Sequence, residues 1–479
     1  MARLAESYAA GSSGHLAHSG QIAKRLNNQW HDVKADYSAT GDGSTDDYSV
    51  IASAFTAVSS AGYGTVYFPD GVYRHSDSFT VPANCLVVLS PGATIKPNTT
   101  LTIKPVFLVD GVDNVTIEGG TLDGSKSTNT NKRTNGIEVK GSTNVSVRNV
   151  VIKDFPGQDS TGINQGDGVL IARNSGGTVP SDIVVEGCTI TGCVRQGISL
   201  IAGTKVRILH NKIMNITGSS PGAGIDVEPD NSTLDLVNDV LIQGNAIDDV
   251  ESGIIVTTAV QVETSVTIDA NHIRNARGGA SGGHGVRLLD GQGDRITNNT
   301  IEECDSDGIY VAGASYAEVI GNTVRNRTTA RQASTYPIHL AGTGAFVVAN
   351  NGVEVTATSD SHGIVADTSA QIGTISGNVV LMGGQNRNAI GLFDTLDIAV
   401  TGNMLYNSGA TGIGINVDYS AANASGHVIT GNRVVGFATG VLLDTTSSYN
   451  NVSANGLRGN TTPITNNGSN NVVDGTNVV

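Results

Sequence analysis

A unit made of two short motifs recurs along most of this chain and restricts the folds available to it. One motif is Gly-Ile-x-Val, as in residues 224–227, and the other is a strand-like run ending in Asn-x-Ile, as in residues 245–247. A unit of about 22 to 30 residues cannot bury its apolar face alone, so successive copies must stack. Copies of Gly-Ile-x-Val or a close variant begin at Gly136, Gly168, Gly197, Gly224, Gly253, Gly285, Gly308, Pro337, Gly363, Ala389, Gly414 and Gly440.

This repeat predicts an all-β chain, a parallel β-helix of about twelve coils in which neighbouring strands hydrogen-bond at about 4.8 Å. The composition agrees, because 61 Gly and only 15% charged residues suit short strands and turns better than helices. A leucine-rich horseshoe is the alternative, but the chain lacks its leucine-rich consensus.

The stretch before the repeats predicts a short capping helix. Residues 41–47 read Gly-Asp-Gly-Ser-Thr-Asp-Asp and precede a helical pattern that runs to about Ser59, with Thr45 or Asp46 as the cap. Together with Gly64-Thr65-Val66-Tyr67-Phe68-Pro69-Asp70-Gly71, this stretch resembles the opening of the pectate-lyase-like superfamily. The resemblance covers residues 31–110 and implies a single-stranded right-handed parallel β-helix, the form shared by phage tailspikes, polysaccharide lyases and mannuronan epimerases.

Three parts of the chain are distinguished on this basis. Residues 1–30 are an attachment or linker segment, residues 31–110 hold the capping helix and first coils, and residues 111–479 form the β-helix. The segment Gly14-His15-Leu16-Ala17-His18 and the following Ile22-Ala23-Lys24-Arg25-Leu26-Asn27 are similar to the N-terminal segments of tail proteins from phages of actinobacteria. This resemblance implies attachment to a phage tail, a place in the virion tail and, by likeness to tailspikes, a homotrimer.

The spacing of the repeats locates a candidate site. Sixteen residues separate Gly308 from Val324, whereas 22 separate Gly168 from Ile190 and 23 separate Gly224 from Ile247. The excess length falls on the coils from Gly168 to Pro337, and loops inserted into a rigid scaffold are where binding sites are usually built. Loop drift without function is the alternative.

Two carboxylates in this region are the candidate catalytic pair. Asp226 and Glu228 are two residues apart on one predicted strand, so both project to the outer face about 7 Å apart at the backbone. Two carboxyl groups at such a separation suit glycoside hydrolysis, one as acid and the other as base or nucleophile, without separating retaining from inverting chemistry. Asp230 is a third candidate, or a turn former, and a charged outward patch is the alternative for the pair.

Further outward positions carry polar and aromatic side chains that can bind substrate. Arg287 lies two coils from Asp226, at about 9.6 Å, and can hold a carboxylate or hydroxyl. Tyr310 offers a stacking face or a proton. Asp167, Asp230, His284 and His339 complete the predicted substrate-binding set. Gly283-His284-Gly285 resembles one element of the polygalacturonase signature, but the other elements are missing, as is the Tyr-Gly-x-Asp-Pro-His pattern of mannuronan epimerases.

Several classes of partner are not expected. The formal charge of −15 disfavours nucleic acid and anionic membranes, no apolar run approaches the roughly 18 residues of a membrane span, and residues 1–28 lack the apolar core of a signal peptide. No motif has metal-ligand spacing and no cofactor is implied. The four cysteines are expected to be buried free thiols, with Cys193 and Cys304 at the position of Val250 and Cys188 at that of a repeat asparagine.

The sequence therefore predicts a tailspike-like polysaccharide depolymerase that cleaves a bacterial surface or capsular glycan by acid/base hydrolysis. A lyase acting on a uronate-containing glycan is the close rival, with Tyr310, His284 or His339 as base and Arg287 neutralising the uronate. A non-catalytic receptor-binding fibre is the alternative from another class.

Overall fold

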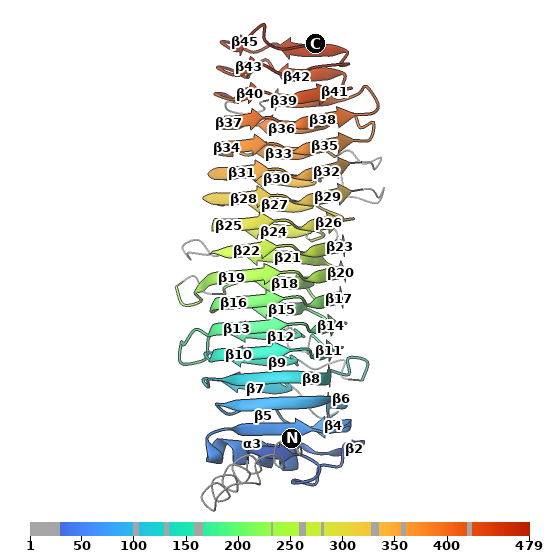
Figure 1. Cartoon of the computed structure of the whole chain (residues 1–479), viewed down its shortest axis with the longest axis vertical. Helices are drawn as coiled ribbons and strands as arrows, with labels where there is room; N and C mark the ends of the chain where they lie inside the picture. The colour runs from blue at the N-terminus through green and yellow to red at the C-terminus, as the bar shows by residue number, and fades with distance from the viewer. Residues whose placement is uncertain are drawn as a thin grey trace, which may run out of the picture.

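The protein forms a long right-handed parallel β-helix closed at one end by a short helix (Figure 1). The structure, a computed structural model, describes residues 29–98, 105–128, 134–157, 166–230, 233–257, 265–278, 282–326, 335–355, 361–418 and 424–479. It has about fourteen turns, so the prediction of about twelve was slightly low. The motif count missed turns at the ends, because β5 and β7 precede the first Gly-Ile-x-Val copy and β44 follows the last.

Each central turn contributes three strands, for example β18 (Ala223–Val227), β19 (Val237–Gln243) and β20 (Ala246–Val250). Strands equivalent to β18 form one 15-stranded parallel sheet, which we call the Gly-Ile-x-Val sheet, and the other two kinds join in a 30-stranded sheet. The Gly-Ile-x-Val sheet comprises β5 (Phe79–Thr80), β7 (Phe107–Asp110), β9 (Ile137–Lys140), β12 (Val169–Ala172), β15 (Gln196–Leu200), β18, β21 (Ser252–Thr257), β24 (Val286–Leu289), β27 (Ile309–Ala312), β30 (Ile338–Ala341), β33 (Ile364–Asp367), β36 (Asn388–Phe393), β39 (Ile413–Asp418), β42 (Thr439–Leu443) and β44 (Thr462–Asn466).

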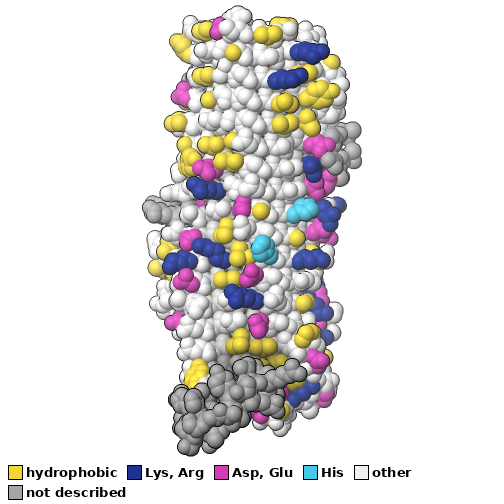
Figure 2. Space-filling model, viewed as in Figure 1, with side chains coloured by type: hydrophobic (Ala, Val, Ile, Leu, Met, Phe, Trp, Pro, Cys, Tyr) yellow, Lys and Arg dark blue, Asp and Glu magenta, His cyan; other side chains and the backbone are white. Residues whose placement is uncertain are grey.

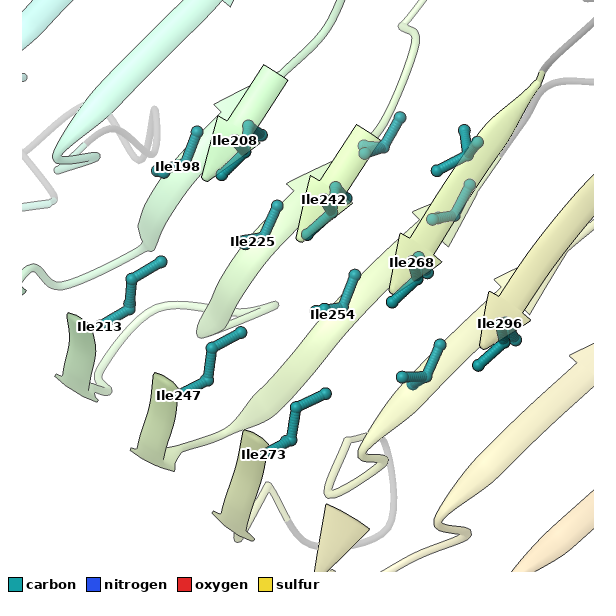
Figure 3. Packing of buried hydrophobic residues seen from close by; sticks show 14 of the residues in the cluster. Ile198, Ile208, Ile213, Ile225, Ile242, Ile247, Ile254, Ile268, Ile273 and Ile296 are labelled. Carbon is teal, nitrogen blue, oxygen red and sulfur yellow. The ribbon is translucent and has the colours of Figure 1, made fainter. Parts of the chain in front are cut away.

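Rows of isoleucine fill the interior, one row from each kind of strand (Figure 3). Ile225 pairs in register with Ile254, and both are fully buried. Each such side chain contributes about 1.5–3 kcal/mol by leaving water. Gly224 is required by space, because a Cβ there would lie 2.7 Å from Ile247 Cγ2 and 2.9 Å from the Gly253 carbonyl oxygen of the next turn. These contacts explain why Gly precedes Ile in the repeat.

The asparagine of the Asn-x-Ile motif forms a buried ladder along the axis. In Asn245, Nδ2 donates to Oδ1 of Asn271 at 2.9 Å and to the Ile208 carbonyl at 2.9 Å, and its backbone N–H donates to the same Asn271 oxygen. Cys188 begins this row, and its N–H donates to Asn211 Oδ1 at 2.9 Å. Each asparagine thus satisfies the backbone groups that a tight corner leaves unpaired.

The predicted capping helix is α3 (Tyr48–Ala61), and it covers the open end of the first turns. Phe55 lies on its buried face, with its ring centroid 5.8 Å from that of Phe79. The N-cap residue is Asp47, which makes no side-chain capping hydrogen bond, so the prediction of Thr45 or Asp46 as the cap was wrong, although Asp46 accepts from the Tyr48 N–H at 3.1 Å. Thr45 does not cap the helix, because it lies in β2 (Asp42–Asp46) and bonds to Asp42 instead.

Some of the predicted segments lie partly or wholly outside the residues that the structure describes. All of the predicted attachment segment except residues 29 and 30 lies outside the described residues, as do parts of the insertions, including residues 158–165, 279–281 and 327–334. The four cysteines are buried and free, as predicted. Within the described ranges, no helix has the length and apolar character needed to cross a membrane.

Candidate active site

The candidate residues share one column on the outer side of the Gly-Ile-x-Val sheet. Strand pairing places Asp226, Ile255, Arg287, Tyr310 and His339 in register, which confirms that Arg287 lies two strands from Asp226. Figure 2 shows acidic, basic and histidine side chains gathered along the middle of the shaft. Asp226 occupies the predicted outward position but is only 1% exposed, because neighbouring side chains cover it.

Three acids meet at that end, two from one turn and one from two turns earlier, and we call Asp167, Asp226 and Glu228, with Arg195 and Gln196, the carboxylate centre. Asp226 lies on β18, and Glu228 directly follows that strand. Asp167 and Gln196 occupy the position before the repeat glycine in two earlier turns, where the chain turns into the strand. Side chains from the corners before the repeat glycines and side chains from β18 and its end therefore meet in the carboxylate centre.

Within the described residues, Asp226 has a hydrogen-bond donor at one carboxyl oxygen only. Nε2 of Gln196 donates a hydrogen bond to Asp226 Oδ2, while Asp226 Oδ1 is buried without a hydrogen-bond partner among the described residues. Burial raises the pKa of Asp226 well above its usual value, and the neighbouring Glu228 raises it further, whereas Arg195 acts in the opposite direction. Asp226 therefore retains its proton at a pH where an ordinary aspartate has lost it.

Arg195 links the other two acids. Its guanidinium lies 3.4 Å from Asp167 Oδ2, 3.4 Å from Glu228 Oε2 and 2.8 Å from Gln196 Oε1. Burial raises the pKa of Asp167 to about 7, although Arg195 lowers it. Glu228, by contrast, has a side chain that is 42% exposed. The centre thus joins two buried acids to one exposed carboxylate.

Sequence reasoning did not select Arg195 or Gln196. Gln196 stands in the column that precedes the repeat glycine, and this column also contains Asp167 and His284, so its position carried a signal. Arg195 lies one residue earlier, in no repeated position. It is identified only when three turns are seen together.

A second group of candidates lies further along the same sheet, and we call its aromatic and imidazole side chains the ring cluster. His284 stacks on Tyr310 with centroids 5.4 Å apart and planes 19° apart, and Tyr310 lies 5.0 Å from His339. Three more rings extend the group, because Tyr336 contacts His339 and His362, and His362 contacts Phe393 at 5.6 Å. The cluster spans β24 to β36.

His339 is fixed between two carboxylates. Its Nδ1 lies 3.1 Å from Asp307 Oδ2 and its Nε2 lies 3.1 Å from Asp367 Oδ2. Burial alone would lower the pKa of His339, but the two carboxylates outweigh it and raise the pKa to about 9. The imidazolium is therefore charged at neutral pH and has both nitrogens occupied.

His284 and Arg287 instead have polar atoms without partners. His284 Nδ1 and Arg287 Nε are buried and make no hydrogen bond within the described parts of the chain. Burial chiefly lowers the pKa of His284 to about 4, and Arg287 lowers it further. A neutral imidazole and a guanidinium whose Nε has no acceptor among the described residues thus lie beside the Tyr310 ring.

Asp230 is not part of either group. It lies in the bend after β18 and lines a cavity of about 320 Å³ with Lys140, Arg173, Asn174 and Asp235. Arg173 already pairs with Asp235 there. Across the described residues, no group of three or more His, Cys, Asp or Glu side chains is placed to hold a metal ion.

Known proteins resemble this chain in two ways. A protein of Bacillus subtilis (strain 168) named Uncharacterized protein YclG is 26% identical over 226 residues, 40% of this chain and 37% of that protein. Mannuronan C5-epimerase AlgE2 of Azotobacter vinelandii is 26% identical over 249 residues, 44% of this chain and 24% of that protein. The match therefore spans well under half the length of either relative.

Among solved structures, the tailspike protein of E. coli bacteriophage HK620 in complex with pentasaccharide has a TM-score of 0.56 at 12% identity, covering 95% of this chain and 80% of that chain. This likeness concerns the fold. The family described as "Right handed beta helix region" matches residues 93–282 and 252–457, which is more than half of the chain and includes every candidate residue. The chain belongs to this right-handed β-helix family.

Proposed function

We propose that the protein hydrolyses a polysaccharide at the carboxylate centre, with Asp226 as general acid and Glu228 as general base or nucleophile. The observation that carries this proposal is the contrast between two adjacent carboxyl groups. Asp226 is buried with a strongly raised pKa, and Glu228 is exposed beside Arg195. Two acids in opposed environments are the arrangement that acid/base cleavage of a glycosidic bond requires.

Each group has a defined part in the proposed reaction. Asp226 gives its proton to the glycosidic oxygen as the bond to the anomeric carbon breaks, and Gln196 fixes the carboxyl group through Oδ2, which leaves Oδ1 to carry the proton. Glu228 either takes a proton from the attacking water or attacks the anomeric carbon itself. Arg195 offsets the negative charge of Glu228 and of Asp167, which lie on either side of it.

Known proteins of similar fold support a glycan as the substrate. HK620 tailspike was solved with a pentasaccharide, and AlgE2 is by name an epimerase of mannuronan. On the same basis we place this chain in a virion tail, where it acts on the glycan of a bacterial surface. The homotrimer and attachment through residues 1–30 belong to the same proposal. Sedimentation of the full chain tests the homotrimer, which should have three times the mass of the 49.1 kDa chain.

A lyase is a second candidate function because of one observation in the ring cluster. His284 is neutral at neutral pH and Arg287 is unpaired among the described residues, so an imidazole base and a uronate-binding cation lie together beside Tyr310. β-Elimination would use His284 or Tyr310 to remove the proton beside the carboxyl group. Hydrolysis remains the first proposal because it combines the buried Asp226 with the adjacent, more exposed Glu228.

Cleavage in water enriched in ¹⁸O distinguishes these functions. The full chain is incubated with a panel of purified capsular and O-antigen polysaccharides, and the products are analysed by mass spectrometry and near-ultraviolet absorbance. Hydrolysis places one ¹⁸O atom at each new reducing end and produces no absorbance. An unsaturated, unlabelled product would replace the hydrolase with the lyase, and binding without any product would favour the non-catalytic fibre.

A further inference from the structure

We propose that the ring cluster and Arg287 form a second glycan-binding site, which holds a sugar unit that carries a carboxylate and does not itself cleave it. This inference deepens the proposed function, on which it rests for the assumption that one glycan occupies both sites. It implies that the substrate is an acidic polysaccharide. It also fixes the direction in which the glycan extends from the carboxylate centre, toward the C-terminal turns.

The unpaired guanidinium is the first reason. Arg195, Arg173 and Arg274 each form an ion pair, at distances of 2.5 to 3.4 Å. Arg287 has no ion pair within the described residues, and its Nε is buried without an acceptor. A buried N–H donor that lacks an acceptor costs free energy, and a carboxylate is the anion whose two oxygens match the planar fork of a guanidinium.

The rings supply the second reason. Tyr310 lies next to Arg287 in register and contacts two imidazole rings, stacking on His284 at a centroid distance of 5.4 Å and meeting His339 at 5.0 Å with the planes tilted by 56°. A pyranose has one apolar face of C–H groups, and it gains free energy by covering an aromatic ring while its hydroxyl groups point sideways to polar partners. The unpartnered His284 Nδ1 is such a polar group.

The third reason is that the cluster is rigid before any ligand arrives. Asp307 and Asp367 hold both nitrogens of His339 at 3.1 Å, and His339 in turn packs against Tyr310 and Tyr336. Fixed side chains lose little entropy on binding. Because both its nitrogens are occupied, His339 acts as a support for the rings, whereas Arg287 and His284 retain free hydrogen-bonding capacity.

The two sites are close enough to hold one chain of sugars. Arg287 lies on β24, two strand spacings from Asp226 on β18, or about 10 Å along the axis. Ile255 alone separates them in the column and is 5% exposed. A short apolar interval therefore joins the cleavage position to the acidic subsite.

Binding is measured with a protein that cannot cleave. In an Asp226→Asn/Glu228→Gln background, calorimetry compares alginate, polygalacturonate and hyaluronan with the same polymers after chemical reduction of their carboxyl groups. We expect at least one acidic polymer to bind and its reduced form to bind at least tenfold more weakly. Arg287→Gln should lose the same factor, Arg287→Lys an intermediate one, and Tyr310→Ala should weaken binding of both forms.

Arg295→Gln is the matched control, because Arg295 is exposed on the 30-stranded sheet, away from the ring cluster, and pairs there with Glu318. The binding of this variant should equal that of the background protein. Melting temperatures confirm that each variant is folded. The proposal is overturned if none of the acidic polymers binds, if the reduced form binds equally well, or if Arg287→Gln has no effect. Because cleavage is absent from this assay, binding without hydrolysis by the native chain would remove the proposed hydrolase and leave this site standing.

Discussion

Gln196 donates a hydrogen bond to one carboxyl oxygen of Asp226 and leaves the other buried and unpartnered within the described residues. A structural carboxylate in a protein interior normally has partners on both oxygens. The arrangement instead fixes the orientation of the acid while keeping one oxygen available. It connects the burial of Asp226, its raised pKa and its proposed chemistry.

The first prediction is that Asp226→Asn stabilises the fold at neutral pH. The pKa of Asp226 in the folded chain lies above the usual 3.8, so the folded state holds its proton more tightly than the unfolded state. Its contribution to stability is therefore fully present below pH 3.8 and is lost as the pH rises toward the folded pKa. Asparagine removes this loss, so the melting temperature should rise at pH 7 and change little near pH 3.5.

Asp248→Asn is the matched control for this experiment. A hydrogen bond and ion pair with Arg274 lower the pKa of Asp248, so its substitution should leave the melting temperature at pH 7 unchanged or slightly reduced. Equal destabilisation by both substitutions would show that Asp226 is an ordinary satisfied acid.

The second prediction concerns Arg195→Met and the pH dependence of cleavage. Arg195 opposes the pKa rise of Asp226, so its removal should let Asp226 keep its proton to higher pH. The alkaline limb of the kcat/KM profile should then move to higher pH, even though overall activity falls. Arg207→Met, which removes an exposed partner of Asp239, should leave the profile in place. An alkaline limb that stays in place in Arg195→Met would show that Arg195 does not influence the pKa of the catalytic acid.

The third prediction uses His339. Its folded pKa of about 9 lies above the ordinary 6.5, so its stabilisation is fully present below pH 6.5 and disappears as the pH rises through about 9. The difference corresponds to on the order of 3 kcal/mol. His339→Gln should lower the melting temperature at pH 6 and flatten its decline up to pH 9.5. His272→Gln, at an exposed position, should retain the native slope.

The fourth prediction tests the asparagine ladder. Asn271→Ala removes the acceptor used by both the N–H and the Nδ2 of Asn245, and each orphaned buried donor costs about 1–3 kcal/mol. We expect a loss of roughly 3 kcal/mol or more in the free energy of unfolding, measured by denaturant titration. Asn238→Ala, at an exposed position of β19, should cost less than about 0.5 kcal/mol. Similar losses in both variants would contradict a specific role for the ladder.

Much of the fold was predictable because its determinants are local. The four residues of the Gly-Ile-x-Val motif include the inward isoleucine and the glycine whose missing Cβ allows the close contact at Gly224. The same motif sets the column in which Asp226 and Arg287 lie. The number of turns was less accessible, since β5 and β7 are built from Phe79 and Phe107 without the motif. Alternation along a strand says which side a residue faces. It does not say what covers that side.

For this reason the candidate site was predicted only in outline. Asp226 and Glu228 were identified from spacing two residues apart, but their different exposure depends on Gln196 and Arg195 from the preceding turn. Those contacts join residues about 30 positions apart. The ring cluster similarly depends on corner residues such as Tyr336 and His362, whose side chains turn toward the sheet.

The most direct test of the central claim is the rate of glycan cleavage by Asp226→Asn and Glu228→Gln, measured on the polysaccharide that the native chain cleaves. With the folded state of each variant confirmed by melting temperature, both rates should fall by about 10²–10⁴, while Asp248→Asn stays within about threefold of the native rate. Cleavage at the native rate by either the Asp226 or the Glu228 variant would contradict the assignment of this pair as the catalytic acid and base.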